Sequence, residues 1–236
     1  LPEPKISLVR PTELTAEQRR CPRSRFAKEI GPTLTPMAVD PGHPFPMLLN
    51  TETYIAVGLA PAAGRRIRGS KLAFVRVPQG LGRVIEIPAS DGRIVYVFTE
   101  DAIRDNIVSL FEGYVVRSAH ALRVTRDADL TIDEEGAEDL LKAIEYQLKQ
   151  RPRGSAVRLE MEKGAPRELV TLLTKTLALA ERDIYHIDGP LDLKPFMKLS
   201  FEIDRPDLKD PLFPPVPTSV PGKNGAIFKE IGRAHV

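Results

Sequence analysis

Four short apolar segments separated by turn residues constrain the fold of this chain more than any other feature. They read TYIAVGLA, KLAFVRVP, RVIEIP and RIVYVF, at residues 53–60, 71–78, 83–88 and 93–98. Each is rich in apolar residues, several of them β-branched or aromatic, and is bounded by Gly, Pro or Asp, which is typical of a β-strand. The sequence SDGR at residues 90–93 is a hairpin-turn signal between the last two segments. The segments therefore predict a sheet of short strands.

Helical patterns alternate with further strand patterns after this point. Thr99 is suited to the N-cap of a helix that Gly113 ends, and a long strand is predicted at residues 114–125. Asp133 is placed to cap a second helix, and Pro166 suits the first position of a third. Strands with segregated helices predict an α+β domain, with a mixed, largely antiparallel sheet and helices packed on it.

The remaining segments are shorter or interrupted. Residues 156–163 alternate apolar and charged side chains, residues 183–188 are a last strand candidate, and residues 191–200 are a short, irregular helix candidate. Residues 15–30 have a helical composition, but Pro22 lies inside them and should break or kink that helix.

Charge and cysteine content exclude some classes of protein. The net charge of +2 over 236 residues lacks the basic excess expected of a dedicated nucleic-acid binder. Cys21 is the single cysteine, so no intrachain disulfide forms. A reducing compartment is the simplest interpretation, although a secreted chain without disulfides would look the same. No apolar run approaches the roughly 20 residues that span a bilayer.

No local pattern of catalytic residues is present. The four histidines are His43, His120, His186 and His235. No two stand at metal-ligand spacing with a partner, so we interpret each as structural or exposed. Ser118 and Ser155 lack the context of a nucleophile elbow. Phosphate-binding glycine motifs are also missing, and the Gly- and Arg-rich residues 60–71 are favoured as a solvated loop over a phosphate contact.

The best polar cluster surrounds the end of the long predicted strand. Period-2 alternation places Arg117 and Arg123 on the same face of that strand, and Arg126 follows directly beside Asp127 and Asp129. Arginine side chains in such a cluster could hold phosphate through two parallel hydrogen bonds. Alternating charges at the end of a strand are more often ion pairs that fix a turn, and the residues alone favour that structural role.

These residues are also part of a resemblance to a known family. The sequence motifs RVTRDAD, GPLDL and DRPDLK, in this order, are joined by the stretches LTPMAVDPGHPFPMLLN, AVRLEME and IYHIDGPLDLKPFMKL. Together they resemble the long, ATP-dependent polyphosphate kinases of bacteria. The resemblance extends over residues 8–217 and matches the head, or middle, domain of that family.

This resemblance implies a function and a domain order. Enzymes of the family transfer the terminal phosphate of ATP reversibly onto polyphosphate through a phosphorylated histidine, with magnesium. Residues 1–7 would be the tail of an N-terminal helical domain, and residues 8–217 the head domain. Residues 218–230 would be a linker and the start of a first C-terminal domain. The family's phosphohistidine lies in the C-terminal domains, so the resemblance assigns no catalytic residue, ATP site or Mg²⁺ site to this chain.

The same resemblance gives the remaining expectations. Arg117, Arg123 and Arg126 are the candidates for polyphosphate-facing or interface positions. ATP and polyphosphate are the expected partners of the parent enzyme, with a homo-oligomer (dimer or tetramer) in the cytoplasm or peripheral at the membrane. No nucleic-acid partner is expected. The alternative is a free-standing module that binds polyphosphate or dimerises without enzymatic activity.

Two stretches depart from the family pattern. RRCPRSRF, residues 19–26, interrupts what is a continuous helix in the family. IGRAHV, residues 231–236, matches no family pattern and equals a translated sequencing-adapter read, so we expect it to be non-native.

Overall fold

The computed structural model describes residues 6–39, 45–62, 71–88, 93–127, 154–211 and 213–214. The chain divides into two compact units, Leu1–Met197 and Lys198–Val236, and the first unit carries all of the sheet structure given below. The helix predicted from Asp133 and the turn residues 90–92 lie outside the described residues, as do His43 and His235.

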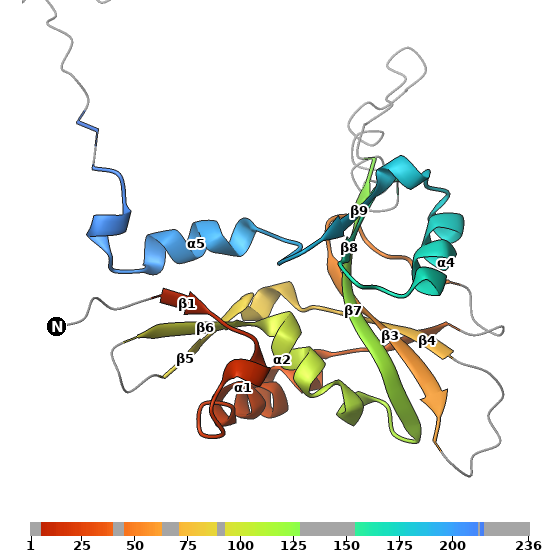
Figure 1. The fold of residues 1–236 in the computed structure, drawn as a ribbon, viewed down its shortest axis with the longest axis horizontal. Helices are drawn as coiled ribbons and strands as arrows, with labels where there is room; N and C mark the ends of the chain where they lie inside the picture. Colours follow the sequence, from red (N-terminus) through yellow and green to blue (C-terminus); the bar gives the residue numbers. More distant parts are fainter. Residues whose placement is uncertain are drawn as a thin grey trace, which may run out of the picture. The chain divides into compact units, whose positions relative to one another are not determined.

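Two sheets form the framework of the first unit (Figure 1). In the smaller sheet β6 lies between β1 and β5, parallel to β1 and antiparallel to β5. The larger sheet has the order β2-β4-β3-β7-β8-β9, and every neighbouring pair in it is antiparallel except β8–β9. The strands are β1 (Ile6–Leu8), β2 (Met37–Val39), β3 (Thr53–Pro61), β4 (Lys71–Arg76), β5 (Val84–Ile87), β6 (Ile94–Phe98), β7 (Tyr114–Arg126), β8 (Ala156–Glu162) and β9 (Ile184–Ile187). The predicted α+β class with a mixed, largely antiparallel sheet is confirmed.

The helices are short and lie between strands in the sequence. The α-helices are α1 (Arg20–Arg25), α2 (Thr99–Asp105), α4 (Arg167–Leu177) and α5 (Lys194–Glu202). A π-helical turn, η2 (Phe26–Ile30), follows α1, and the 3₁₀ turns are η1 (Pro11–Glu13), η3 (Gly31–Thr33), η4 (Gln79–Leu81), η5 (Ile107–Leu110), η7 (Glu181–Asp183) and η8 (Pro206–Leu208). In the described part of the chain no helix is long and apolar enough to cross a membrane.

Two helix-start predictions need correction. Thr99 is not an N-cap but the first residue of α2, and its hydroxyl donates to the carbonyl of Gly82 at 2.8 Å. Residues 15–30 do not form one continuous α-helix. The helix α1 begins at Arg20 with Pro22 in its first turn, where the missing N–H has no intrahelical partner to lose, and the π-helical turn η2 follows from Phe26. Pro166 directly precedes α4, one position earlier than predicted.

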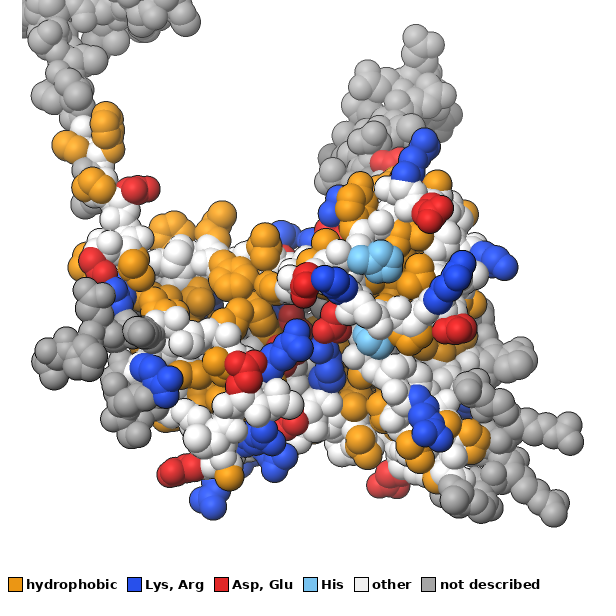
Figure 2. All heavy atoms as spheres, viewed as in Figure 1, with side chains coloured by type: hydrophobic (Ala, Val, Ile, Leu, Met, Phe, Trp, Pro, Cys, Tyr) orange, Lys and Arg blue, Asp and Glu red, His pale blue; other side chains and the backbone are white. Residues whose placement is uncertain are grey.

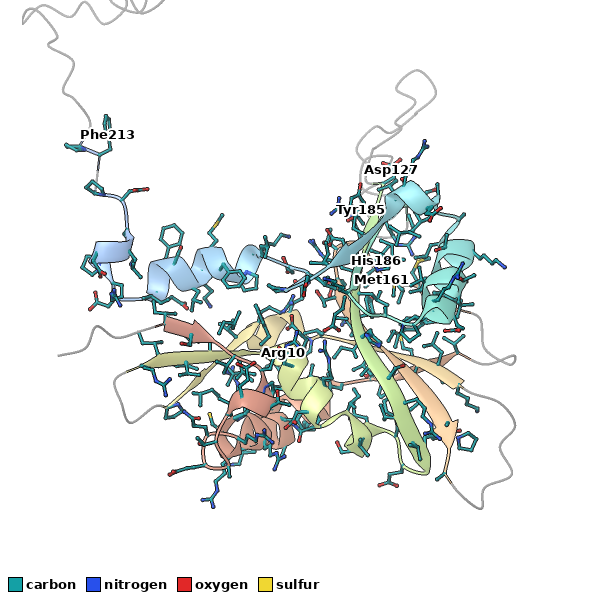
Figure 3. All side chains as sticks on the ribbon, in the orientation of Figure 1. Arg10, Asp127, Met161, Tyr185, His186 and Phe213 are labelled. Carbon is teal, nitrogen blue, oxygen red and sulfur yellow. The ribbon has the colours of Figure 1, made fainter. Side chains whose placement is uncertain are left out.

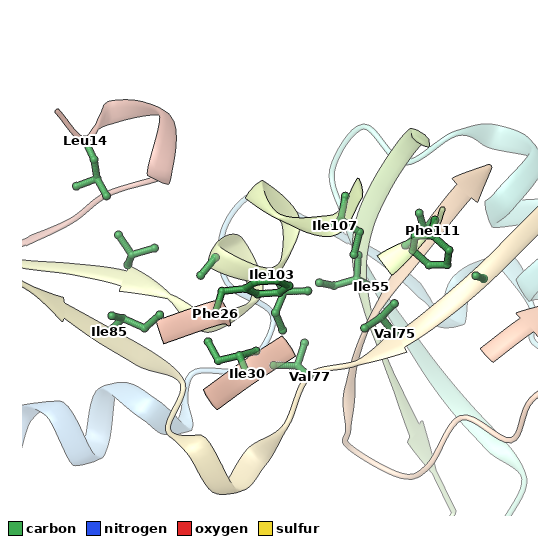
Figure 4. Close-up of a cluster of buried hydrophobic side chains, with 14 of the residues drawn as sticks. Leu14, Phe26, Ile30, Ile55, Val75, Val77, Ile85, Ile103, Ile107 and Phe111 are labelled. Carbon is green, nitrogen blue, oxygen red and sulfur yellow. The ribbon is translucent and has the colours of Figure 1, made fainter. Parts of the chain in front are cut away.

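The larger sheet separates two apolar cores. Along β3, Ile55 and Val57 enter the core shared with α2, η2 and the smaller sheet, whereas Tyr54 and Ala56 enter the core beneath α4. Figure 4 shows the first core, with Ile103 of α2 packed among side chains from the strands and from η2. Strict alternation along β3 therefore buries both faces of this strand.

A β-bulge interrupts β7. Gly58 pairs with Ser118 but Leu59 pairs with Val116, so Arg117 is an extra residue with no partner on β3. The extra residue shifts the alternation by one position. The predicted shared face of Arg117 and Arg123 is therefore wrong, since a bulge separates them.

Candidate functional site

The side chain of Arg126 binds backbone carbonyl groups of other segments. Its side chain is buried, with Nε donating to the carbonyl of Leu48 at 2.7 Å and Nη1 donating to the carbonyl of Gly154 at 2.8 Å. Its backbone N–H donates to Oδ1 of Asn50 at 2.9 Å. Burial lowers the pKa of the Arg126 guanidinium, and the Tyr54 hydroxyl opposes that change. The side chain thus fastens three segments together at the end of β7.

Arg123 belongs to a polar surface shared by β7, β8 and β9. Its Nε donates to the carbonyl of Thr51 at 3.0 Å, and its Nη1 lies 3.4 Å from Oε2 of Glu160. Arg158 donates to the other oxygen of the same carboxylate at 3.0 Å and stacks over the ring of Tyr185, 3.7 Å from its centroid. Figure 3 shows Tyr185 on β9. One carboxylate is therefore held between two guanidinium groups.

The predicted arginine candidates do not form one site. Arg117 is exposed at the bulge, Arg123 is paired with Glu160, and Arg126 is buried on backbone carbonyls. The two described histidines have different environments. His120 lies 3.9 Å from Glu162, and its pKa is lowered by burial against the raising effect of that carboxylate, whereas His186 is exposed on β9. Among the described residues no group of three His, Cys, Asp or Glu side chains is placed to hold a metal ion.

The sequence analysis missed a buried network of charged side chains around Arg83. Arg83 donates from Nε and Nη2 to both oxygens of Glu100, at 3.2 and 2.6 Å. Its Nη1 donates to Oδ2 of Asp192 and to Oγ1 of Thr53, each at 3.2 Å. The side chains of all three charged residues are at most 9% exposed. This network joins β3, the start of β5, α2 and the loop before α5.

Asp192 belongs to the GPLDL motif that carried the family resemblance. Its other oxygen accepts from the backbone N–H of Lys194 at 3.2 Å. The motif therefore contributes a structural carboxylate. In the sequence, this aspartate stands out only because it is the one charged residue of an otherwise apolar motif. No nearby residue pattern indicates Arg83 as its partner.

A charged cavity of about 290 Å³ lies beside this network. Its lining includes the last residues of four strands, Leu8 of β1, Phe98 of β6, Glu162 of β8 and Ile187 of β9. The other lining residues are Val9, Arg10, Glu13, Glu100, Asp101, Arg104, Ala121, Lys163, Asp188, Gly189, Pro190 and Leu191. Because β1–β6 and β8–β9 are parallel pairs, the cavity lies at the carboxyl ends of both pairs, the edge at which parallel sheets bind ligands.

The charges around the cavity are only partly matched. Arg104 donates to Oε1 of Glu162 at 3.0 Å and lies 3.5 Å from Oδ1 of Asp101. Burial is the largest cause that raises the pKa of Asp101, to about 6, against the lowering effect of Arg104. Nε of Arg104 is buried and has no hydrogen-bond partner. Figure 2 shows acidic and basic side chains side by side near the middle of the face that it draws.

The fold and this cavity define the chain as an α+β domain with charged groups at a sheet edge. Residues 17–199 match the model of the polyphosphate kinase middle domain, and the chain belongs to this family.

Related proteins agree with that assignment. The chain is 44% identical over 188 residues to a polyphosphate kinase of Halalkalibacterium halodurans, covering 79% of this chain and 26% of the relative. It is 41% identical over 214 residues to one of Streptomyces coelicolor (90% and 28%) and 36% identical over 235 residues to one of Neisseria meningitidis serogroup C (98% and 34%). The chain thus spans about a quarter to a third of the length of these relatives.

A solved structure has the same fold. The polyphosphate kinase from Porphyromonas gingivalis superposes with a TM-score of 0.66 at 21% identity, covering 89% of this chain and 30% of that chain. At this identity the likeness concerns the fold.

Proposed function

We propose that this chain is the middle domain of a polyphosphate kinase that transfers the terminal phosphate of ATP reversibly to inorganic polyphosphate. The observation that carries the proposal is the family match over residues 17–199. The parent enzyme forms a phosphohistidine on a residue outside this chain, uses Mg²⁺ and ATP, and works as a homo-oligomer in the cytoplasm.

The middle domain supplies structure to that reaction. Phosphoryl transfer needs a nucleophilic imidazole and several cations that converge on the transferring group. Here Arg83 is bound by Glu100 and Asp192, and Arg104 by Glu162. Internal carboxylates engage both guanidinium groups, which favours a non-catalytic role.

Arg117 and Arg123 are the positions we propose to face polyphosphate or a neighbouring subunit. Arg117 is exposed, and Arg123 shares Glu160 with the half-exposed Arg158. Arg126 contributes to such a surface through the backbone that it holds at Leu48 and Gly154.

A chimera tests the proposal. The segment of the Streptomyces coelicolor relative that aligns over 214 residues is replaced by this chain's sequence, and polyphosphate synthesis from radiolabelled ATP is measured. We expect synthesis by the chimera and neither synthesis nor covalent ³²P labelling by this chain alone. A folded but inactive chimera would contradict the assignment, and ³²P bound to this chain would contradict the non-catalytic role. If the chimera is inactive but this chain alone binds polyphosphate in a salt-sensitive manner, the result would favour the free-standing binding module.

A further inference from the structure

Three charged groups at the cavity lack adequate partners. Nε of Arg104 is a buried donor without an acceptor, and the carboxylate of Asp101 has an ion pair of 3.5 Å with Arg104. Arg10 is exposed, and in the described part of the chain no hydrogen bond or ion pair involves its guanidinium. All three residues line both the 290 Å³ cavity and a neighbouring one of about 310 Å³. Buried donors and acceptors in native proteins are normally satisfied, so the unpaired Nε of Arg104 indicates a missing acceptor, and the other two members of this trio line the same cavities.

The remaining polar groups of the cavity are occupied. Glu162 accepts from Arg104 and from the backbone N–H of Ala121 at 3.2 Å. Both oxygens of Glu100 accept from Arg83, and Lys163 donates to Asp188 at 2.9 Å. A partner for the trio must therefore accept from guanidinium groups and donate to a carboxylate.

We propose that this cavity binds a small zwitterion, an α-amino acid with an aliphatic side chain. Its carboxylate accepts from Arg10 and from Nε of Arg104, and its ammonium group donates to Asp101. The carboxylate and ammonium groups of an α-amino acid are on the same carbon, which suits a donor and an acceptor that are themselves neighbours on α2. The apolar wall formed by Leu8, Phe98 and Leu191 takes the side chain.

Charge selects a zwitterion over the other small ligands. Carboxylates outnumber cations in the lining, since Glu13, Glu100, Asp101, Glu162 and Asp188 face Arg10, Arg104 and Lys163. A phosphate ion would bring further negative charge beside these carboxylates, at a cost that grows as the surroundings exclude water. A simple amine would leave the Arg104 donor unpaired. The volume of about 290 Å³ is at the low end for small-molecule sites, roughly 300–1,000 Å³, and suits a compact ligand.

Binding at this position would join separate segments of the domain. Arg10 follows β1, Asp101 and Arg104 lie on α2, and residues 187–191 also line the cavity. Asp192, directly after this loop, is fixed by Arg83. The ligand would therefore connect the loop and the first strand to the same helix that carries Glu100.

A matched ligand series tests the proposal. Isothermal titration of the full 236-residue chain at pH 7.5 uses L-valine, 2-methylpropylamine, which lacks the carboxylate, and 3-methylbutanoate, which lacks the ammonium group. Inorganic phosphate is the fourth probe. We expect binding of L-valine, with each truncated analogue weaker by about tenfold or more, because each loses one charge-assisted interaction. No binding of L-valine at 10 mM, equal binding of either analogue, or tighter binding of phosphate would overturn the proposal.

Two variants locate the binding. Arg10→Gln removes an exposed guanidinium that has no hydrogen bond or ion pair in the described part of the chain, so this variant is expected to fold and to bind valine about tenfold less tightly. Asp101→Asn is expected to weaken valine but not 3-methylbutanoate. Asp183→Asn, in η7 and outside the lining of both cavities, is the matched control and should leave affinity unchanged. Unchanged valine affinity in Arg10→Gln, with circular dichroism equal to the wild type, would exclude this site.

Discussion

Replacing Arg83 by methionine should destabilise the domain severely. Methionine keeps the length of the aliphatic stem but removes a guanidinium that donates to Glu100, Asp192 and Thr53. The carboxylate side chains are 7% and 9% exposed, so neither can recover its hydration without opening the structure. Breaking a buried ion pair by removing one partner costs about 3–5 kcal/mol, and here two carboxylates lose the same partner. We therefore expect a loss at or above the upper end of that range.

Urea denaturation followed by circular dichroism measures the effect. The free energy of unfolding is taken from the midpoint and slope for the wild type and for Arg83→Met. The control is Arg182→Met, because Arg182 is 89% exposed and lies 3.9 Å from Asp183; its loss should be below about 0.5 kcal/mol.

A second variant separates charge burial from packing. In the triple variant Arg83→Met, Glu100→Gln, Asp192→Asn the uncompensated charges are removed, while the shapes of the two acidic side chains are kept. We expect it to regain at least half of the stability lost in Arg83→Met. A loss under about 1 kcal/mol for Arg83→Met, or no recovery in the triple variant, would refute the electrostatic reasoning.

Two further predictions concern the cavity and the turns. Because burial raises the folded-state pKa of Asp101 from 3.8 to about 6, its stabilising contribution is complete below pH 4 and is lost as the pH rises through 6. Asp101→Asn should therefore be more stable than the wild type by about 2 kcal/mol at pH 7.5, and equally stable near pH 4, in urea titrations at both values. A methyl group at Gly154 would overlap the backbone carbonyl of Asp127, whereas one at Gly58 would lie 2.6 Å from the Ser118 hydroxyl, which can rotate away. Thermal unfolding should show a larger loss for Gly154→Ala than for Gly58→Ala, and Ser118→Ala should rescue only the second.

Most strands were predictable from the sequence because their signals are local. Three apolar segments are bounded by turn residues, and each contains a strand of the structure. They are residues 53–60, 71–78 and 93–98. The bulge at Arg117 was not predictable, since it arises from pairing with Gly58 across the sheet and leaves no mark on β7 itself. Sequence alternation alone therefore assigned Arg117 and Arg123 to one face.

The candidate site was less predictable than the fold because its contacts are distant in sequence. Arg83 and Glu100 are 17 residues apart, and Arg83 and Asp192 are 109 apart. The cavity collects the ends of strands from two sheets, and no window of the sequence contains that arrangement. The charged cluster at residues 123–129 lies within one short segment, so the sequence alone was enough to recognise it as a candidate site.

Residues of the sequence motifs that identify the family hold segments of this domain together. Arg126 donates to two backbone carbonyls, and Asp192 holds Arg83 and the N–H of Lys194. Substituting such a residue should reduce the amount of folded protein before it changes the chemistry of the parent enzyme.

The pair Arg126→Met and Arg117→Met tests this view. Arg126→Met leaves the carbonyls of Leu48 and Gly154 without their donor, at about 1–3 kcal/mol for each buried acceptor, whereas Arg117 is exposed and its replacement should cost under about 0.5 kcal/mol. In the chimera, synthesis per folded molecule should be unchanged in Arg126→Met below its melting temperature. An Arg126→Met chimera with full stability but without activity would instead show that this guanidinium acts on the phosphate directly.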